Sequence, residues 1–300
     1  MLAPICLFVY NRLEHTIACI NALKNNNLAK ESELFIFSDY AKNEKDILDV
    51  NRVRMYLENI DGFKKVNIIM REKNFGLANN IIDGVTKIVN EYGKIIVLED
   101  DLVTSSDFLK YMNDGLELYA DEEKVASIHG YVYPLPHYER LTETFFIRGA
   151  DCWGWATWAR AWKHFEPDGK KLLKELKRQH LSKKFNFNNS YPYVNMLEDQ
   201  IKGRNNSWAI RWYASAFINN MYTLYPRQSL VQNIGMDNSG THCGYNDYFN
   251  NELIKYINLN KQSVIESEIA KNEFIYYFKR LRFLSRKQKL INFFNKIIRK

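Results

Sequence analysis

The chain has 300 residues, enough to bury a sizeable core in one large domain or two closely associated ones. It carries 42 Lys and Arg against 35 Asp and Glu, but residues 271–300 hold ten of these basic residues and only one acid. The rest of the chain is close to neutral, so we expect no nucleic-acid partner. No apolar run is long enough for a membrane span, and the four cysteines show neither metal-site spacing nor disulfide-framework density, so we expect a cytoplasmic protein.

Strands and helices alternate through the first hundred residues. Residues 1–10 lack the basic leader and cleavage site of a signal peptide, so we interpret residues 3–10 as a first buried strand. Further strands are expected at 33–38, 65–71 and 94–98, with helices at 13–23, 44–60 and 77–92 between them. This alternation predicts an α/β fold in which a mostly parallel sheet carries helices on both faces.

The strongest functional signal lies at residues 95–102, where an apolar strand runs directly into Glu99, Asp100 and Asp101. Ligand sites in open α/β sheets lie just beyond the carboxyl ends of such strands. Three adjacent carboxylates repel one another, and Mn²⁺ or Mg²⁺ with oxygen ligands is their simplest partner. Such a cation can take its remaining ligands from a substrate diphosphate. The alternative is a solvated acidic turn before a helix that Ser105 or Ser106 caps.

These residues carry a resemblance to a known family. The sequences VLEDDL at 97–102 and SDFLKY at 106–111 resemble the metal motif of GT-A glycosyltransferases, with the N-acetylglucosaminyltransferase I family as the closest pattern. More broadly, residues 3–245 are similar to family 2-like sugar transferases of bacterial polysaccharide synthesis. The resemblance implies a Rossmann-like GT-A fold, with Asp101 as the metal ligand and with Glu99 and Asp100 facing the donor sugar and ribose.

Two further polar signals fall at the same expected edge of the sheet. Arg12 follows the first strand, and its planar guanidinium can pair with a diphosphate or a nucleobase. Asp39 follows the second strand and can accept the N–H of a uracil ring. The resemblance assigns similar donor-binding roles to both residues. The alternatives are a surface charge at a helix entry for Arg12 and a turn residue for Asp39.

Other nucleotide-binding patterns are missing from the sequence. Neither the Gly-x-Gly-x-x-Gly fingerprint nor a Gly-x-x-x-x-Gly-Lys-Ser/Thr phosphate loop follows the first strand, which counts against dehydrogenases and nucleotide hydrolases. Nucleotidyltransferases share a related fold but usually carry a Gly-rich, Arg-containing loop at this point. A nucleotidyltransferase that forms a sugar nucleotide therefore stays an alternative to a glycosyltransferase.

Four of the six tryptophans lie within residues 153–162. Indole rings offer flat apolar faces that suit stacking on sugars, and we expect Trp153 and Trp155 to bind the acceptor. The alternative is that the tryptophans form a core between the sheet and its helices. A glycan-binding module without catalysis, built on this cluster, is the non-enzyme alternative.

A second acidic pair, Glu198 and Asp199, lies in a segment with helical spacing. Transfer with inversion needs a carboxylate, separate from the metal ligands, that removes the proton of the acceptor hydroxyl. The resemblance places this base at Asp199, with Glu198 in reserve. It also implies that Arg211, in an Arg-Trp element, neutralises the departing diphosphate. An exposed charge pair and a structural ion pair are the respective alternatives.

The end of the chain gives two more expectations. Residues 236–242 form a loop rich in Gly, Asn and Asp, and His242 fits the late His that many GT-A enzymes bring to the metal or the diphosphate. The tail interleaves aromatic and aliphatic residues with Lys and Arg, as in helices that lie on anionic membranes. We therefore expect a peripheral location on the inner face of the cytoplasmic membrane. Nucleic acid or a protein partner could use the same pattern, and a helix packed on the domain is the plainest alternative.

Together these features predict a metal-dependent, inverting glycosyltransferase. Its donor would be a nucleotide sugar, most simply a UDP-sugar, and its acceptor a hydroxyl of a glycan or a lipid-linked glycan in bacterial surface polysaccharide synthesis. The expected organisation is a nucleotide-sugar-binding half at 1–102, an acceptor-binding half at 103–245 and a basic helical tail at 246–300.

Overall fold

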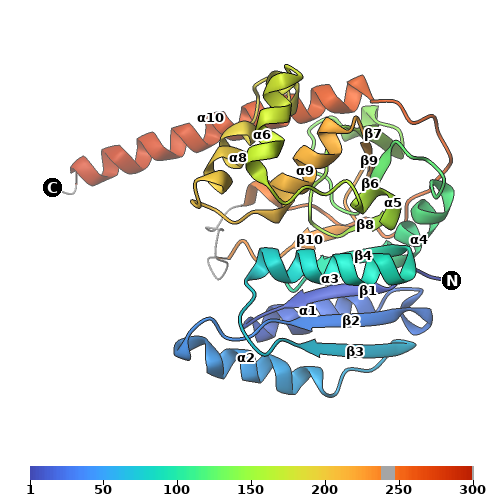
Figure 1. The fold of residues 1–300 in the computed structure, drawn as a ribbon. Helices are drawn as coiled ribbons and strands as arrows, with labels where there is room; N and C mark the ends of the chain where they lie inside the picture. The colour runs from blue at the N-terminus through green and yellow to red at the C-terminus, as the bar shows by residue number, and fades with distance from the viewer. Residues whose placement is uncertain (238–246, 299–300) are drawn as a thin grey trace.

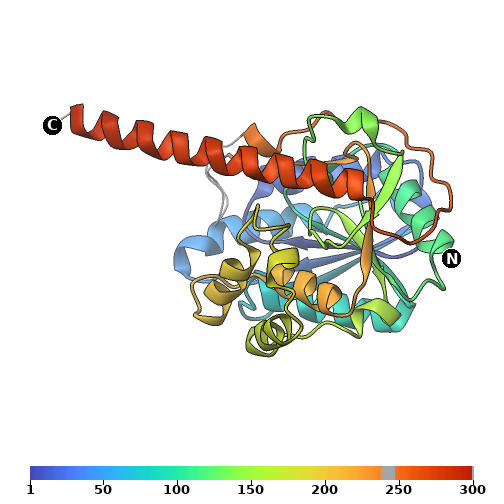
Figure 2. The ribbon, with the colours of Figure 1, turned by 90° about the horizontal axis from the view of Figure 1, so that it is seen from above.

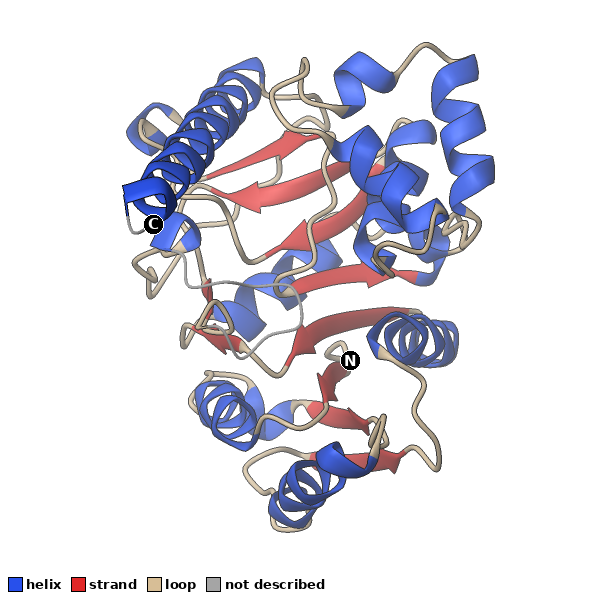
Figure 3. Ribbon diagram, turned by 90° about the vertical axis from the view of Figure 1, so that its left-hand side faces the viewer, coloured by secondary structure: helices blue, strands red, loops and turns tan. Residues whose placement is uncertain are grey.

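The computed structural model describes residues 1–237 and 247–298, and for residues 285–298 it gives the course of the backbone. Within these residues the main sheet has eight strands in the order β3-β2-β1-β4-β8-β6-β9-β7. Figure 3 shows the sheet with helices on both faces. The strands are β1 Ile5–Val9, β2 Glu33–Ser38, β3 Lys65–Met70, β4 Lys94–Glu99, β6 Val125–His129, β7 Thr144–Ile147, β8 Trp155–Trp158 and β9 Tyr222–Pro226.

The first four of these strands form a parallel unit. They pair in the order β3-β2-β1-β4, and three helices connect them: α1 Leu13–Lys24, α2 Glu44–Leu57 and α3 Leu77–Tyr92. Asn43 caps α2 by accepting the N–H of Lys45, and Gly93 ends α3 with a φ of 78° that suits glycine. Every residue of β1 is buried, as expected of a central parallel strand.

The second half of the sheet is mixed. β8 runs antiparallel between β4 and β6, β9 is parallel to β6, and β7 is antiparallel to β9. A separate two-stranded sheet joins β5 Leu102–Thr104 to β10 Val231–Asn233. The larger helices of this half are α4 Phe108–Leu118, α6 Gly169–Arg178, α8 Tyr193–Ile201 and α9 Trp208–Ile218, and shorter ones are α5 Ala159–Trp162 and α7 Ser182–Phe185.

Helix α10, Glu268–Ile298, ends the described chain. Figures 1 and 2 show that its first part lies on the domain and its last part extends beyond it. Phe274 and Phe278 are buried among aromatic rings of the domain, including that of Tyr133. The start of α10 therefore belongs to the core. No helix in the described residues is long and apolar enough to cross a membrane.

The architecture confirms the predicted fold class. Six of the eight strands are parallel to one another, as expected of a mostly parallel α/β sheet. The predicted strand at 33–38 and helix at 77–92 match β2 and α3 residue for residue. The tryptophan segment differs from expectation because it contributes strand β8 to the middle of the sheet.

Candidate functional site

The chain order reverses between β1 and β4, and the two strands lie side by side. This is the topological switch point of the sheet, the place where α/β proteins bind ligands beyond the strand ends. Arg12 follows β1, and the three acids end and follow β4. The guanidinium of Arg12 donates to Asp100 and, over 2.9 Å, to Oδ2 of Asp101. The structure therefore brings Arg12 and the acidic triplet together, as the sequence predicted.

Charge at this edge is unbalanced, because one guanidinium faces three carboxyl groups. Burial, together with the neighbouring carboxylates of Asp101 and Asp100, raises the pKa of Glu99 to about 8. Burial also raises the pKa of Asp100 to about 6, against the opposing effect of Arg12. Among the residues that the structure describes, none forms a hydrogen bond with the buried Oδ2 of Asp100. A further positive charge would relieve both the repulsion and the unsatisfied oxygen.

These residues fit a hard divalent cation. The available donors are carboxylate oxygens, which Mn²⁺ and Mg²⁺ prefer. Within the described residues no group of three or more His, Cys, Asp or Glu side chains surrounds a single point. The protein would thus supply one or two ligands, with Asp101 or the free oxygen of Asp100 as candidates, and a diphosphate would supply others.

The segment after β10 closes over this pair of charges. The N–H of Ile234 donates to the carbonyl of Asp101 over 2.8 Å. A Cβ on Gly235 would lie 2.3 Å from Oδ2 of Asp101 and 2.9 Å from Nη1 of Arg12, so a larger residue here would displace these two side chains. His15 of α1 lies 3.2 Å from a carboxylate oxygen of Asp237. The predicted metal ligand His242 follows this segment and lies outside the described residues.

Asp39 is placed at the neighbouring strand end, but its carboxylate is already engaged. Its oxygens accept the backbone N–H groups of Tyr40, Phe75 and Gly76 at 2.8–2.9 Å and the side-chain N–H of Asn74 at 3.2 Å. Asp39 is 4% exposed. It therefore holds the turn at 74–76 against the end of β2, and its predicted contact with a nucleobase stays a prediction.

The tryptophans divide into two groups. Trp155 is fully buried and stacks on Trp208 of α9, with ring centroids 5.4 Å apart. Trp158 and Trp162 are also buried. Trp155 therefore forms core and offers no face to a sugar, which corrects its predicted role in acceptor binding. Trp153 is half-buried on the segment that leads to β8, so its predicted role stays open.

The two candidate bases lie on α8. Asp199 is half-buried and pairs with Arg204 over 3.1 Å, and Glu198 pairs with Lys177 over 3.7 Å. Figure 1 shows α8 at the end of the molecule toward which β1 and β4 run. No contact joins either acid to the acidic triplet among the described residues, so the base at Asp199 stays a prediction.

Arg211 is 7% exposed near the start of α9. Its guanidinium donates to the carbonyls of Ser207 and Pro167 over 3.1 and 3.2 Å, and burial lowers its pKa. Arg211 thus joins α9 to the loop before α6. The structure does not bring it to the carboxylates, and its predicted contact with the diphosphate is untested.

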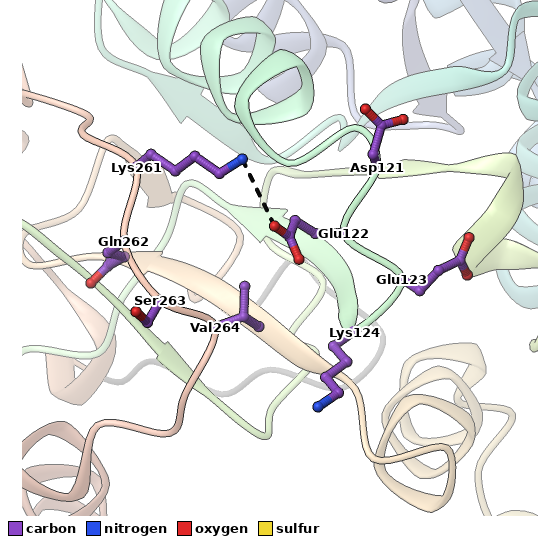
Figure 4. A pocket seen from close by; sticks show the side chains of 8 residues that line it. All are labelled: Asp121, Glu122, Glu123, Lys124, Lys261, Gln262, Ser263 and Val264. Carbon is purple, nitrogen blue, oxygen red and sulfur yellow. Dashed lines mark ion pairs between the residues drawn. The ribbon is translucent and has the colours of Figure 1, made fainter.

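A cavity of about 830 Å³ lies elsewhere. Figure 4 shows its lining, from Asp121–Lys124 on one side to Lys261–Val264 on the other, with Lys261 3.8 Å from Glu122. Lys124 immediately precedes β6. Strand β8 is antiparallel to both β4 and β6, so β6 runs parallel to β4. The cavity therefore lies at the amino ends of the strands, the edge opposite Arg12 and the acids.

Sequence reasoning missed Asp151. Its carboxylate accepts hydrogen bonds from Tyr133 over 2.9 Å and from Tyr225 over 2.8 Å. The two tyrosines lie 18 and 74 positions from Asp151 in the sequence, so no local pattern joins the three residues. The Arg-Gly-Ala-Asp-Cys stretch just before the tryptophans was the available signal.

No protein-family model matches the chain, and no curated protein matches it. The chain is, however, similar to solved structures. The mannosyltransferase PcManGT from Pyrobaculum calidifontis, in complex with GDP-Man and Mn²⁺, is 12% identical, with 73% of this chain and 75% of that chain covered and a TM-score of 0.42. S. aureus TarS is 16% identical at a TM-score of 0.31, and the match covers 43% of this chain. The match spans 21% of the TarS chain, about a fifth.

UDP-glucose pyrophosphorylase complexed with UDP-glucose is also similar, at 12% identity and a TM-score of 0.36, with 75% and 90% of the two chains covered. Glycosyltransferases are thus among the solved structures that the chain resembles, as the sequence motif predicted. Identities this low concern the fold alone, and TM-scores below 0.5 carry no argument about the chemistry of the chain.

Proposed function

We propose that the protein is a metal-dependent glycosyltransferase that uses a nucleotide-diphosphate sugar, most simply a UDP-sugar. The observation that supports this most is the grouping of Arg12 with Glu99, Asp100 and Asp101 at the switch point of the sheet. A cation held by carboxylates beside a guanidinium suits a diphosphate, which needs positive charge from two directions. Carboxylates beside a guanidinium suit a diphosphate with its cation better than an anion alone or a metal ion alone.

The residues divide the work as follows. Asp101 would hold Mn²⁺ or Mg²⁺, and the ion, when bound, supplies charge that stabilises the departing diphosphate. Arg12 turns from the acids toward the phosphates and orients them. Residues 234–237, which follow β10, cover Arg12 and Asp101 and exclude water, which limits hydrolysis of the donor.

Asp199 removes the proton from the acceptor hydroxyl, with Glu198 as the reserve base. The hydroxyl then attacks the anomeric carbon from the face opposite the diphosphate, so the configuration inverts. Nearby carboxylates stabilise the oxocarbenium-like charge that develops on the sugar. Asp199 must release Arg204 for this step, since the two are paired in the structure.

We place the acceptor among glycans and lipid-linked glycans of a bacterial surface polysaccharide. Helix α10 supports this, because its outward face exposes Ile269, Tyr276 and Phe283 at intervals of seven residues. Exposed Lys279 and Arg280 flank this stripe. An apolar stripe beside cations suits the surface of an anionic bilayer, where a lipid-linked acceptor would lie. Sedimentation with anionic and neutral vesicles tests this part.

A thermal-shift screen of UDP, GDP, dTDP and CMP, each with and without Mn²⁺, tests the donor site. Ligands that bind only the native state raise its apparent stability by mass action. We expect a Mn²⁺-dependent shift with one nucleotide, and no shift with any of them would refute the proposal. Pyrophosphate released from a nucleoside triphosphate and a sugar phosphate would instead identify a nucleotidyltransferase.

A further inference from the structure

Asp151 is a half-buried carboxylate that neutral groups hold in place. Tyr133 donates to its Oδ1 over 2.9 Å, and Tyr225 donates to its Oδ2 over 2.8 Å. Within the described ranges, 1–237 and 247–284, no lysine or arginine forms an ion pair with it. Asp151 is therefore a partly exposed carboxylate whose position is fixed by neutral donors.

The backbone places Asp151 beside the candidate donor site. In the antiparallel pair of β8 and β4, Trp155 lies opposite Val97. Residues before Trp155 therefore run past the carboxyl end of β4, where Glu99 and Asp101 lie. Burial raises the pKa of the Cys152 thiol, and the carboxylates of Glu99, Asp151 and Asp101 raise it too. The three carboxylates therefore lie near this thiol.

The two tyrosines hold Asp151 rigidly. Tyr225 is fully buried on β9, where its ring stacks on Phe145 with centroids 6.0 Å apart. Tyr133 packs edge-on against Phe274 of α10 at 5.4 Å. Burial raises the pKa of both hydroxyls, so they stay protonated and donate. A carboxylate fixed by buried donors is preorganised for a ligand.

The chemistry of the group limits what it can bind. Each oxygen of Asp151 has used one lone pair on a tyrosine and keeps another. Sugar hydroxyls are donors that fit such acceptors, whereas a sugar with its own carboxylate would meet a like charge. We propose that Asp151 binds hydroxyl groups of the transferred sugar and thereby selects neutral sugars over acidic ones. This inference rests on the proposed function and names the class of sugar for the same site.

The test is isothermal titration with UDP, three neutral UDP-sugars (glucose, galactose and N-acetylglucosamine) and UDP-glucuronic acid, all with Mn²⁺. We expect at least one neutral sugar to bind about tenfold more tightly than the glucuronic acid derivative. Asp151→Asn should reduce this ratio about tenfold while the affinity for UDP stays the same. An Asp151→Asn protein that keeps the wild-type ratio would overturn the inference.

Two further variants separate charge from folding. Tyr133→Phe removes one donor but keeps the charge, so it should weaken binding of the neutral sugar and still discriminate against the acidic one. Asp121→Asn makes the same charge change at the opposite edge of the sheet and should leave the ratio as in the wild type. If wild-type protein binds UDP but discriminates among none of these sugars, the inference fails and the proposed function stands. If UDP itself does not bind, the proposed UDP donor is refuted.

Discussion

Oδ2 of Asp101 lies 2.9 Å from the guanidinium of Arg12, although the two residues are 89 positions apart in the chain. The contact joins the end of β1 to the end of β4 across the point where the sheet reverses its order. The contact holds the positively charged guanidinium of Arg12 against Asp101, the predicted metal ligand. We therefore expect nucleotide binding to rearrange this pair, since the guanidinium of Arg12 has to turn from the carboxylates to contact a diphosphate.

Arg12→Gln should weaken nucleotide binding about 10- to 100-fold, the effect of losing one charge-assisted hydrogen bond. Titration calorimetry with the nucleotide from the screen measures the change. Arg52→Gln is the matched control, because Arg52 forms an exposed pair with Asp49 and this variant should bind as the wild type does. Equal affinities for both variants would remove Arg12 from the site.

Asp199→Asn should abolish transfer of sugar to the acceptor, because an amide cannot take up the proton. The affinity for the donor should change little, since the residue lies apart from the acidic triplet. Product formation and donor binding, measured on the same preparation, separate the two effects. Asp168→Asn, a change at the cap of α6, is the control for α-helical surface charge. Full transfer by Asp199→Asn would move the base to another residue, with Glu198 tested next.

The pH dependence of stability tests the buried acids. Folding raises the pKa of Glu99 to about 8 and that of Asp100 to about 6, above their ordinary values of 4.5 and 3.8. Such groups favour the folded state only while they are protonated, so their contribution is lost as the pH rises through the raised pKa. The melting temperature of metal-free protein should therefore fall between about pH 5 and about pH 8.

Glu99→Gln should remove much of that fall, because the amide has no proton to lose. Glu117→Gln, a change at an exposed residue of α4, should leave the slope unchanged. Thermal melts in a chelator across this range measure both variants. An unchanged slope in Glu99→Gln would contradict the raised pKa.

Trp155→Ala should destabilise the protein by about 3–5 kcal/mol, as expected when a large aromatic side chain leaves the core. Trp155 is fully buried between Trp208, Trp162 and Trp212. Trp153→Ala should cost less, because Trp153 is half-buried. Urea denaturation compares the two variants, and equal losses would argue against placing Trp155, and not Trp153, in the core.

The parallel half of the fold could be predicted from sequence because its signals are local. β1, β2 and β4 are short, mostly buried runs, the helices have apolar residues at helical spacing, and Asn43 and Gly93 mark helix ends. The meeting of Arg12 with the acids followed from topology alone, since carboxyl ends of parallel strands share one edge.

The rest depended on long-range packing. Trp155 belongs to a strand inserted antiparallel between β4 and β6, and nothing near it in the sequence distinguishes a buried indole from a sugar-binding one. Asp39 looked free in the sequence, but backbone N–H groups from 75 and 76 occupy its carboxylate. Asp151 depends on tyrosines 18 and 74 residues away.

The central claim is that carboxylates after β4 bind a nucleotide diphosphate through a divalent cation. Titration of the screened nucleotide into wild-type and Asp101→Asn protein, with Mn²⁺ and with a chelator, tests it most directly. Asp114→Asn, an exposed change on α4, is the control. We expect Mn²⁺ to tighten nucleotide binding by at least tenfold in the wild type and the control and to have no effect in Asp101→Asn. Equal tightening in Asp101→Asn, or none in the wild type, would contradict the account.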